Sequence, residues 1–271
     1  MNSFPANIPD WLFEKFLEMG GILSFHDFMN ITLNDSQNGY YGSGKAKIGI
    51  DGDFVTSPSL SNDFASLLGI QIEDWFIQFS KNSNYVEKFN ILEFGSGNGC
   101  LMEGIINYFL INNPEIVKNI SFKIIEVNLG MISKQKNRLK KFLDKEIDIS
   151  WIDLDEVEER SINGLIIAHE VLDAFPVERI QYKDGNIYRQ GVELDEKNKK
   201  LKFKNIVLTK DLRKKINEIQ INLGVNIPPR NAPDEWTTEL HVNNSLWLRD
   251  IYKIINNGIL LIIDYAIDSK R

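Results

Sequence analysis

A glycine-rich segment at residues 91–99 constrains the fold of this chain more than any other sequence feature. It begins with a short apolar run that contains one acid, Glu93. Glycines then follow at alternate positions: Gly95, Gly97 and Gly99. Glycine allows a sharp turn and lets a ligand approach the main chain, because no Cβ stands in the way. Since a helix is expected over about residues 100–109, the segment predicts a strand, a ligand-binding turn and a helix.

A second acid, Glu126, ends the next apolar run and favours a nucleoside cofactor. An acid at that place can accept hydrogen bonds from both hydroxyls of a ribose. The fingerprint for a dinucleotide needs Gly or Ala at position 100, where this chain has Cys100. Glu93 would also suit the ammonium of S-adenosylmethionine better than a pyrophosphate. The observed spacing, E-x-G-x-G-x-G, resembles motif I of the class I S-adenosylmethionine methyltransferases, and S-adenosylmethionine is therefore the expected cofactor.

From residue 89 onward, apolar runs alternate with helical patterns. The expected strands are Ile91–Phe94, Phe122–Val127, Ile149–Ile152, Gly164–Ala168 and Ile259–Asp264. The expected helices between them are Leu101–Ile111, Gly130–Phe142 and Ser245–Asn256. This alternation predicts an α/β fold with a doubly wound parallel sheet, the Rossmann-like arrangement of class I methyltransferases. Such sheets bind ligands at the carboxyl ends of their strands, where Glu93, the glycines, Glu126, His169-Glu170 and Asp264-Tyr265 all fall.

Two regions lie outside this alternation. Residues 1–88 are predicted to be an N-terminal helical and lid region, preceding a cofactor-binding domain at residues 89–271. Its expected helices are Ile8–Met29, with a break at Gly20-Gly21, and Ser61–Phe79. An insertion at about residues 177–244 separates the fourth and fifth strands. It is expected to contain the strands Arg179–Tyr182, Asn186–Val192 and Leu201–Leu208 and the helix Lys210–Ile219, and to recognise the substrate above the cofactor cleft.

Composition excludes several other classes of protein. The net charge of −7 over 271 residues argues against binding to nucleic acid, which needs clustered Lys and Arg. Cys100 is the single cysteine, so no internal disulfide can form, and no Cys/His pair has the spacing of a metal site. The longest apolar stretch, Ile259–Ile263, is too short to span a bilayer, and the N-terminus carries no secretory signal.

Several motifs together resemble the MidA-like S-adenosylmethionine-dependent methyltransferases. They are Ser24–Met29, Gly39–Tyr41, Gly52–Pro58, Glu93–Gly99, His169–Val177 and Ile263–Tyr265. Mitochondrial members of this family are protein arginine methyltransferases that act in the assembly of respiratory complex I. The resemblance implies a protein substrate with an arginine acceptor, a respiratory-complex subunit among the candidate partners, and a bacterial cytoplasmic or mitochondrial matrix location.

The resemblance covers about the N-terminal two thirds of such a protein. Family members continue beyond the fifth strand and usually have Gly after the Asp-Tyr pair, where this chain has Ala266. The fifth strand would then be an exposed sheet edge, which makes a homodimer a candidate assembly.

Chemistry assigns provisional roles to the polar residues at the strand ends. Glu170 and Asp173 are the candidate catalytic residues, since carboxylates would orient a guanidinium and offset the charge that develops on it. The alternatives are that Glu170 caps or salt-bridges the next helix and that Asp173 caps a turn. Asp153 is a candidate partner for the adenine amino group or a solvated acid. Thr56 is expected to bond the cofactor or the substrate, or to shape the turn before Pro58.

Three other functions stay open at this stage. A small-molecule methyltransferase would have the same cofactor site and a different acceptor. A non-catalytic assembly factor would bind a partner protein and keep a vestigial cofactor pocket. A nicotinamide oxidoreductase is disfavoured by Cys100, which interrupts the dinucleotide fingerprint.

Overall fold

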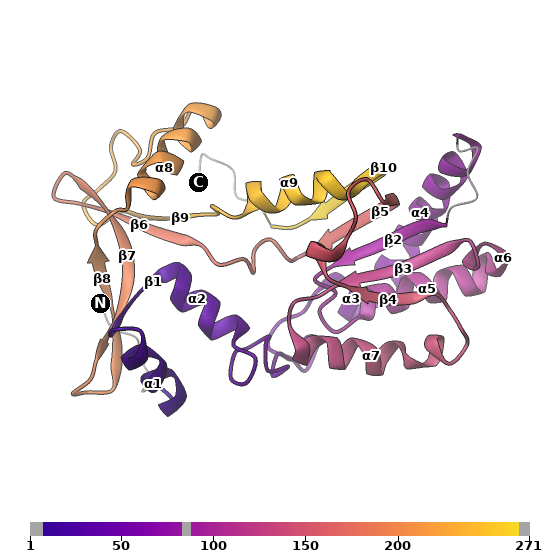
Figure 1. The fold of residues 1–271 in the computed structure, drawn as a ribbon, viewed down its shortest axis with the longest axis horizontal. Coiled ribbons are helices and arrows are strands. Elements are labelled where there is room, and N and C mark those ends of the chain that lie inside the picture. Colours follow the sequence, from indigo (N-terminus) through magenta and orange to yellow (C-terminus); the bar gives the residue numbers. More distant parts are fainter. Residues whose placement is uncertain (1–7, 83–87, 266–271) are drawn as a thin grey trace. The chain divides into compact units, whose positions relative to one another are not determined.

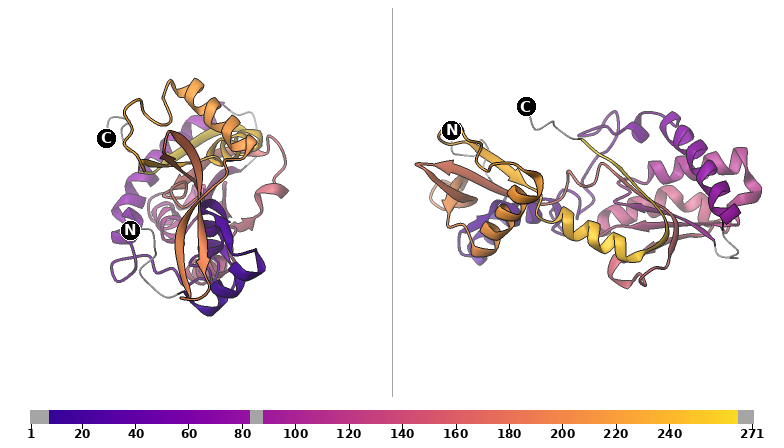
Figure 2. Two further views of the ribbon diagram at one scale, coloured as in Figure 1. Left: turned by 90° about the vertical axis from the view of Figure 1, so that its left-hand side faces the viewer. Right: turned by 90° about the horizontal axis from the view of Figure 1, so that it is seen from above.

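The computed structural model describes residues 8–82 and 88–265, which form two compact units (Figures 1 and 2). One unit combines the chain up to Thr32 with Phe175–Leu246. The other combines Leu33–Ala174 with the chain from Trp247 onward. This spatial grouping differs from the sequence-based division at residue 88, because the N-terminal region is shared between the two units.

The second unit is built on a five-stranded parallel sheet. Its strands are β2 (Phe89–Phe94), β3 (Ile120–Ile125), β4 (Ile149–Ile152), β5 (Ile162–His169) and β10 (Ile255–Ile263). They lie in the order β10-β5-β2-β3-β4, with every pair parallel. The chain moves outward from β2 to β4 and then crosses to β5 and β10, so the strand order reverses between β2 and β5. The predicted doubly wound sheet is confirmed, and its switch point lies at the carboxyl ends of β2 and β5.

Helices cover both faces of this sheet. They are α3 (Ser57–Leu60), α4 (Asp63–Asn82), α5 (Cys100–Asn112), α6 (Pro114–Val117), α7 (Leu129–Leu143) and α9 (Asn244–Ile254), with a 3-10 turn η1 at Leu154–Glu156. Views from the front and from above place α4 and α9 on opposite sides of the sheet (Figures 1 and 2). Within the described ranges, no helix is both long and apolar enough to cross a membrane.

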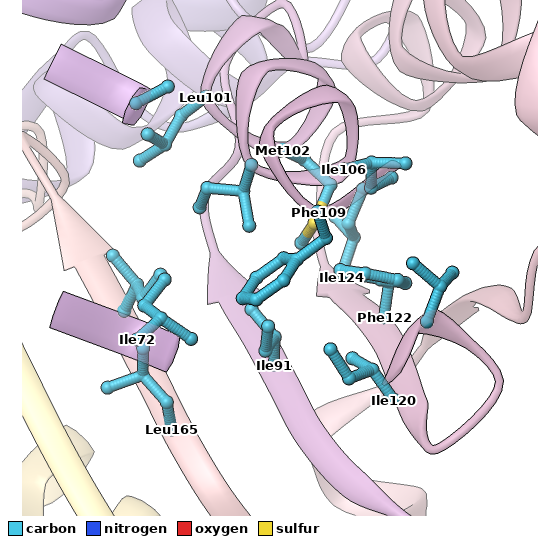
Figure 3. Packing of buried hydrophobic residues seen from close by; sticks show 14 of the residues in the cluster. Ile72, Ile91, Leu101, Met102, Ile106, Phe109, Ile120, Phe122, Ile124 and Leu165 are labelled. Carbon is cyan, nitrogen blue, oxygen red and sulfur yellow. The ribbon is translucent and has the colours of Figure 1, made fainter. Parts of the chain in front are cut away.

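The main hydrophobic core lies between the sheet and helices α4, α5 and α7. Phe109 points from α5 toward Ile91 of β2, and both side chains are fully buried (Figure 3). Odd-numbered residues of β2 face this core, because successive side chains of a strand point to opposite faces. Phe94 therefore faces the other side, where its ring meets Trp247 of α9 at 5.2 Å between centroids. Burying a side chain such as Phe109 contributes about 1.5–3 kcal/mol.

The first unit is an antiparallel sheet with its own helices. Its strands are β1 (Ile22–Ser24), β6 (Glu178–Lys183), β7 (Asn186–Asp195), β8 (Lys200–Ile206) and β9 (Thr237–Leu240), and its helices are α1 (Asp10–Glu18), α2 (Phe25–Asn34) and α8 (Lys210–Leu223). The strand order is β1-β7-β6-β9, with β8 also paired to β7. The three strands and the helix predicted for the insertion are present, and a turn at Asp184-Gly185 joins β6 to β7.

Two elements differ from the sequence prediction. The expected helical stretch Ile8–Met29, with its break at Gly20-Gly21, is confirmed in part: α1 and α2 are helices, but the strand β1 between them was not predicted. Gly20 and Gly21 both have left-handed φ values, which ends α1, and β1 then pairs with residues 191–193 of β7. Strand β9 was missed, since its sequence Thr-Thr-Glu-Leu lacks a clear alternation of apolar and polar residues.

Candidate active site

The glycine-rich turn has the geometry that its sequence predicts. Gly95 and Gly97 have φ values of 65° and 52°, a region that L side chains rarely adopt. A Cβ on Gly95 would also collide with Cγ2 of Val171. Gly99 caps the start of α5, where Oδ1 of Asn98 accepts the Cys100 N–H at 3.2 Å. The backbone therefore turns directly at the carboxyl end of β2, with no Cβ at Gly95, Gly97 or Gly99.

Glu93 lies beneath this turn and is only 3% exposed. Its Oε2 accepts a hydrogen bond from the Ser96 hydroxyl at 2.6 Å, and the backbone N–H of Met102 also donates to it. Burial raises the pKa of Glu93 to about 7, the Ser96 hydrogen bond opposes the rise, and the charge of Glu126 adds to it. Glu93 thus braces the turn from within, and its predicted contact with a ligand ammonium stays a prediction.

Glu126 directly follows β3 and is joined to the glycine turn through Gln135 of α7. Its Oε1 accepts the Asn128 N–H at 3.0 Å, and its Oε2 accepts the Gln135 side-chain amide at 3.0 Å. The same amide nitrogen donates to the Gly97 carbonyl at 2.9 Å. Burial raises the pKa of Glu126, although these hydrogen bonds oppose the rise. The Asn128 side chain and the Val127 backbone are further hydrogen-bond partners of this carboxylate, and its contact with the hydroxyls of a ribose stays a prediction.

A second acidic group lies at the carboxyl ends of β5 and β10. Glu170 follows β5 with a left-handed φ of 49°, a strained conformation for a non-glycine residue. Burial raises the pKa of Glu170, and the nearby charge of Asp173 raises it further. The side chains of Glu170 and Tyr265 are hydrogen-bonded, and the charge of Glu170 raises the pKa of Tyr265. The structure therefore brings Glu170, Asp173 and Tyr265 together, at the end of the strand next to β2.

Asp264 holds the loop that carries Glu170 and Asp173. Its Oδ2 accepts the backbone N–H groups of Leu172 at 3.0 Å and Asp173 at 3.2 Å, and its Oδ1 accepts the Tyr265 N–H at 2.8 Å. The sequence placed Asp264 at a strand end and gave it no partner. Only the pairing of β10 with β5 brings its carboxylate to backbone groups about ninety positions earlier in the chain.

His169, the last residue of β5, is uncharged near neutral pH. Burial lowers its pKa, and its ring packs against Phe64 at 5.1 Å between centroids. Its Nε2 lies 3.9 Å from Oε1 of Glu170, which is beyond hydrogen-bond distance. His169 therefore contributes packing here rather than a charge.

From the sequence, Tyr41 was either a core aromatic or a contact of the lid, and in the structure it lies near the acids of this site. Its side chain is half-buried, and burial raises the pKa of its hydroxyl. The charges of Asp173 and Glu126 raise that pKa further, so the hydroxyl lies near both acids. The loop around it docks on the start of α7, where the Gly130 N–H donates to the Gly42 carbonyl at 3.2 Å. In the sequence, the Gly-Tyr-Tyr motif at residues 39–41 was the feature that marked Tyr41.

The loop at residues 46–54 lies against the glycine turn. The Asn98 side-chain amide donates to the Ile48 carbonyl at 3.3 Å, and Ile48 forms a bridge with Phe54. A cavity of about 370 Å³ lies between residues 46–52, Asn98 and Lys134. Residues 46–54 of the predicted lid region therefore contact the glycine turn within the same compact unit.

Two predicted site residues, Asp153 and Thr56, make only local contacts among those that the structure describes. These contacts agree with the alternatives of a solvated acid for Asp153 and a turn-shaping role for Thr56. Asp153 is exposed, and its Oδ1 accepts the Asp155 N–H at 3.1 Å at the start of η1. Thr56 precedes α3, and its backbone N–H donates to the Ser59 hydroxyl at 2.9 Å. Their contacts with a cofactor or substrate stay predictions.

The residues present fit S-adenosylmethionine. The turn at Gly95 keeps a Cβ away from the strand end, and Glu126 offers acceptors for ribose hydroxyls. The acids Glu93, Glu170 and Asp173 gather at the same strand ends, which suits a ligand that carries positive charge rather than a pyrophosphate. Burial raises the pKa of the Cys100 thiol to about 11, so this thiol is not a nucleophile at neutral pH.

Comparison with known proteins gives consistent matches. Residues 67–271 match the model of a family of S-adenosyl-L-methionine-dependent methyltransferases. The mitochondrial protein arginine methyltransferase NDUFAF7 of Homo sapiens is 28% identical over 203 residues, which cover 68% of this chain and 44% of that protein. The Bos taurus protein of the same name is 28% identical over 59% of this chain and 39% of its own length. The chain thus spans about two fifths of these relatives.

The fold also matches a solved structure. A protein from Burkholderia thailandensis, crystallised with S-adenosylhomocysteine, superposes with a TM-score of 0.75 at 22% sequence identity. The match covers 98% of this chain and 66% of that protein. Nearly the whole chain, the antiparallel unit included, therefore has a counterpart in the fold of that protein.

Proposed function

Because the chain belongs to the family of S-adenosyl-L-methionine-dependent methyltransferases, we propose that it methylates proteins, with an arginine side chain as acceptor. The cofactor follows from the family, and the acceptor is the proposed step. Relatives named as protein arginine methyltransferases support it, at 28% identity. The main structural support is the loop with Glu170 and Asp173, which Asp264 holds through two backbone N–H groups.

We propose that the cofactor lies at the carboxyl ends of β2 and β3. Glu126 would accept hydrogen bonds from the ribose, while the backbone of Gly95, Gly97 and Gly99 would line the amino acid tail. Glu93 would act on that tail through the turn it braces. Asp153 would accept a hydrogen bond from the amino group of the adenine, and Thr56 would bond the cofactor or the substrate. When bound, S-adenosylmethionine would supply a methyl group on a positively charged sulfur, and S-adenosylhomocysteine would be the leaving group when that methyl group passes to the acceptor nitrogen.

Glu170 and Asp173 would handle the acceptor. A guanidinium is a planar cation whose N–H groups match carboxylates in pairs, so two acids can fix its orientation. Orientation of the acceptor supplies a large part of the rate of such a displacement. Carboxylates beside the guanidinium would also stabilise the extra charge on nitrogen and accept its proton. The fixed loop supports this role because it limits the positions that the two acids can take.

A methyl-transfer assay tests this proposal. The chain is incubated with S-adenosylmethionine labelled on the methyl group and with lysate proteins or arginine-containing peptides. We expect label in protein, and acid hydrolysis should release it as methylarginine. Glu170→Gln and Asp173→Asn should each lose transfer by about 100-fold or more while S-adenosylhomocysteine still binds.

Controls separate this function from its rivals. Glu158→Ala, which changes an exposed acid on a solvent-facing turn, should transfer at the wild-type rate. Label found only in small metabolites would replace the protein acceptor with a small molecule. Cofactor binding with no transfer to either pool would favour a non-catalytic binding role.

A further inference from the structure

Gln135 is a fully buried polar side chain on the otherwise apolar face of α7. The buried positions of this helix are Met131, Gln135, Leu139 and Phe142, and Gln135 is 0% exposed. Burying an amide is costly unless its hydrogen bonds are satisfied. An apolar residue would therefore be the expected occupant of a position whose only task was packing.

The amide of Gln135 meets three partners that fix its orientation. Its Nε2 donates to the Gly97 carbonyl at 2.9 Å and to Oε2 of Glu126 at 3.0 Å. Its Oε1 accepts the indole N–H of Trp151 at 2.9 Å. A carbonyl and a carboxylate only accept, and an indole only donates, so a single orientation of the amide satisfies all three.

These contacts join three separate segments of the cofactor site. Gly97 belongs to the glycine turn after β2, Glu126 follows β3, and Trp151 lies in β4. The helix passes close to the turn at this point, since a Cβ on Gly99 would lie 3.5 Å from Cα of Gln135. One side chain thus bonds both to the turn and to the acid that follows the neighbouring strand.

We propose that Gln135 is a positioning residue for the cofactor: it fixes the rotamer of the Glu126 carboxylate and ties that carboxylate to the glycine turn. The inference rests on the proposed role of Glu126 toward the ribose. Without the Gln135 amide, the Glu126 carboxylate keeps its local hydrogen bonds with Asn128 and Val127 but loses its tie to α7 and to the glycine turn, so the plane of the carboxylate can rotate. The hydroxyls of a ribose would then meet an acceptor that is no longer aimed at them.

The test compares two ligands by calorimetry, S-adenosylhomocysteine and its 2′-deoxy analogue. The ratio of their affinities reports the bond from Glu126 to the 2′-hydroxyl and is expected to be about tenfold or more in the wild type. Gln135→Met keeps the size of the side chain and removes all three hydrogen bonds. Gln135→Leu is a second apolar variant that removes the same three hydrogen bonds with a branched side chain. Gln190→Met is the matched control, because Gln190 is a buried glutamine of the antiparallel sheet.

The proposal expects the ratio to fall below about threefold in both Gln135 variants and to stay at the wild-type value in Gln190→Met. A purely structural role would weaken both ligands equally and keep the ratio, which would overturn the proposal. If Gln135→Met does not fold, as thermal unfolding would reveal, Gln135→Leu decides. A wild-type ratio near one would overturn the ribose role of Glu126 and this inference with it. Failure of the methyl-transfer assay alone would leave the ratio unchanged.

Discussion

Replacement of Gly95 by alanine should destabilise the protein through two separable effects. The φ of 65° costs an L side chain about 1–2 kcal/mol. The new Cβ would also collide with Cγ2 of Val171 and lie 3.2 Å from its Cβ. Valine is stiff at χ1, so this neighbour cannot easily turn away, and such overpacking costs about 1–3 kcal/mol. Together the two effects predict a loss of about 2–5 kcal/mol in the free energy of unfolding.

A control glycine and a double variant separate the two effects in urea unfolding experiments. Gly185 has a similar φ of 76° and no atom within 4 Å of a new Cβ, so Gly185→Ala should lose only about 1–2 kcal/mol. Val171→Ala should relieve the collision, so its combination with Gly95→Ala should show a favourable coupling of about 1 kcal/mol or more. The reasoning is refuted if Gly95→Ala costs no more than Gly185→Ala, or if the coupling to Val171 is zero.

Three further predictions concern the buried acid, the clamped loop and the core. The pKa of Glu93 is about 7 in the folded chain against an ordinary 4.5, so between these pH values the folded state holds a proton that the unfolded state releases. The free energy of unfolding should therefore fall by up to about 3 kcal/mol as pH rises from 4.5 to 7. Urea titrations should show that Glu93→Gln removes this contribution. Asp264→Ala should lower kcat for methyl transfer about 100-fold with little change in S-adenosylhomocysteine affinity, because it releases the loop; an equal loss of binding in calorimetry would contradict this. Phe109→Ala should cost about 3–5 kcal/mol in thermal unfolding, and a cost below 1 kcal/mol would exclude its packing role.

The parallel sheet could be predicted from sequence because its central strands are buried on both faces. Runs such as Gly164–Ala168 of β5 are apolar without alternation, which distinguishes them from amphipathic helices. The N-terminal region was harder, because β1 exists only through its pairing with β7, about 170 positions later. A short segment next to two helices carries no local sign of such a partner.

The sequence could predict those residues of the candidate site that directly follow a strand. It could not predict the residues whose contacts depend on tertiary packing. Glu126 and Glu170 stand directly after strands, so topology alone gathers them. Gln135 and Asp264 act through bonds to segments that are distant in sequence. For Gln135 the available signal was a polar residue at helical spacing between Met131 and Leu139 on a buried face.

The most direct test of the cofactor site is calorimetric titration of the chain with S-adenosylhomocysteine, beside Glu126→Ala and the exposed control Glu158→Ala. The account predicts binding by the wild type and the control. It predicts affinity about 10–100-fold weaker in Glu126→Ala, because hydrogen bonds to a charged acceptor contribute about 1.5–3 kcal/mol. Absence of binding by the wild type, or equal affinity in Glu126→Ala, would contradict a cofactor held at the carboxyl ends of β2 and β3.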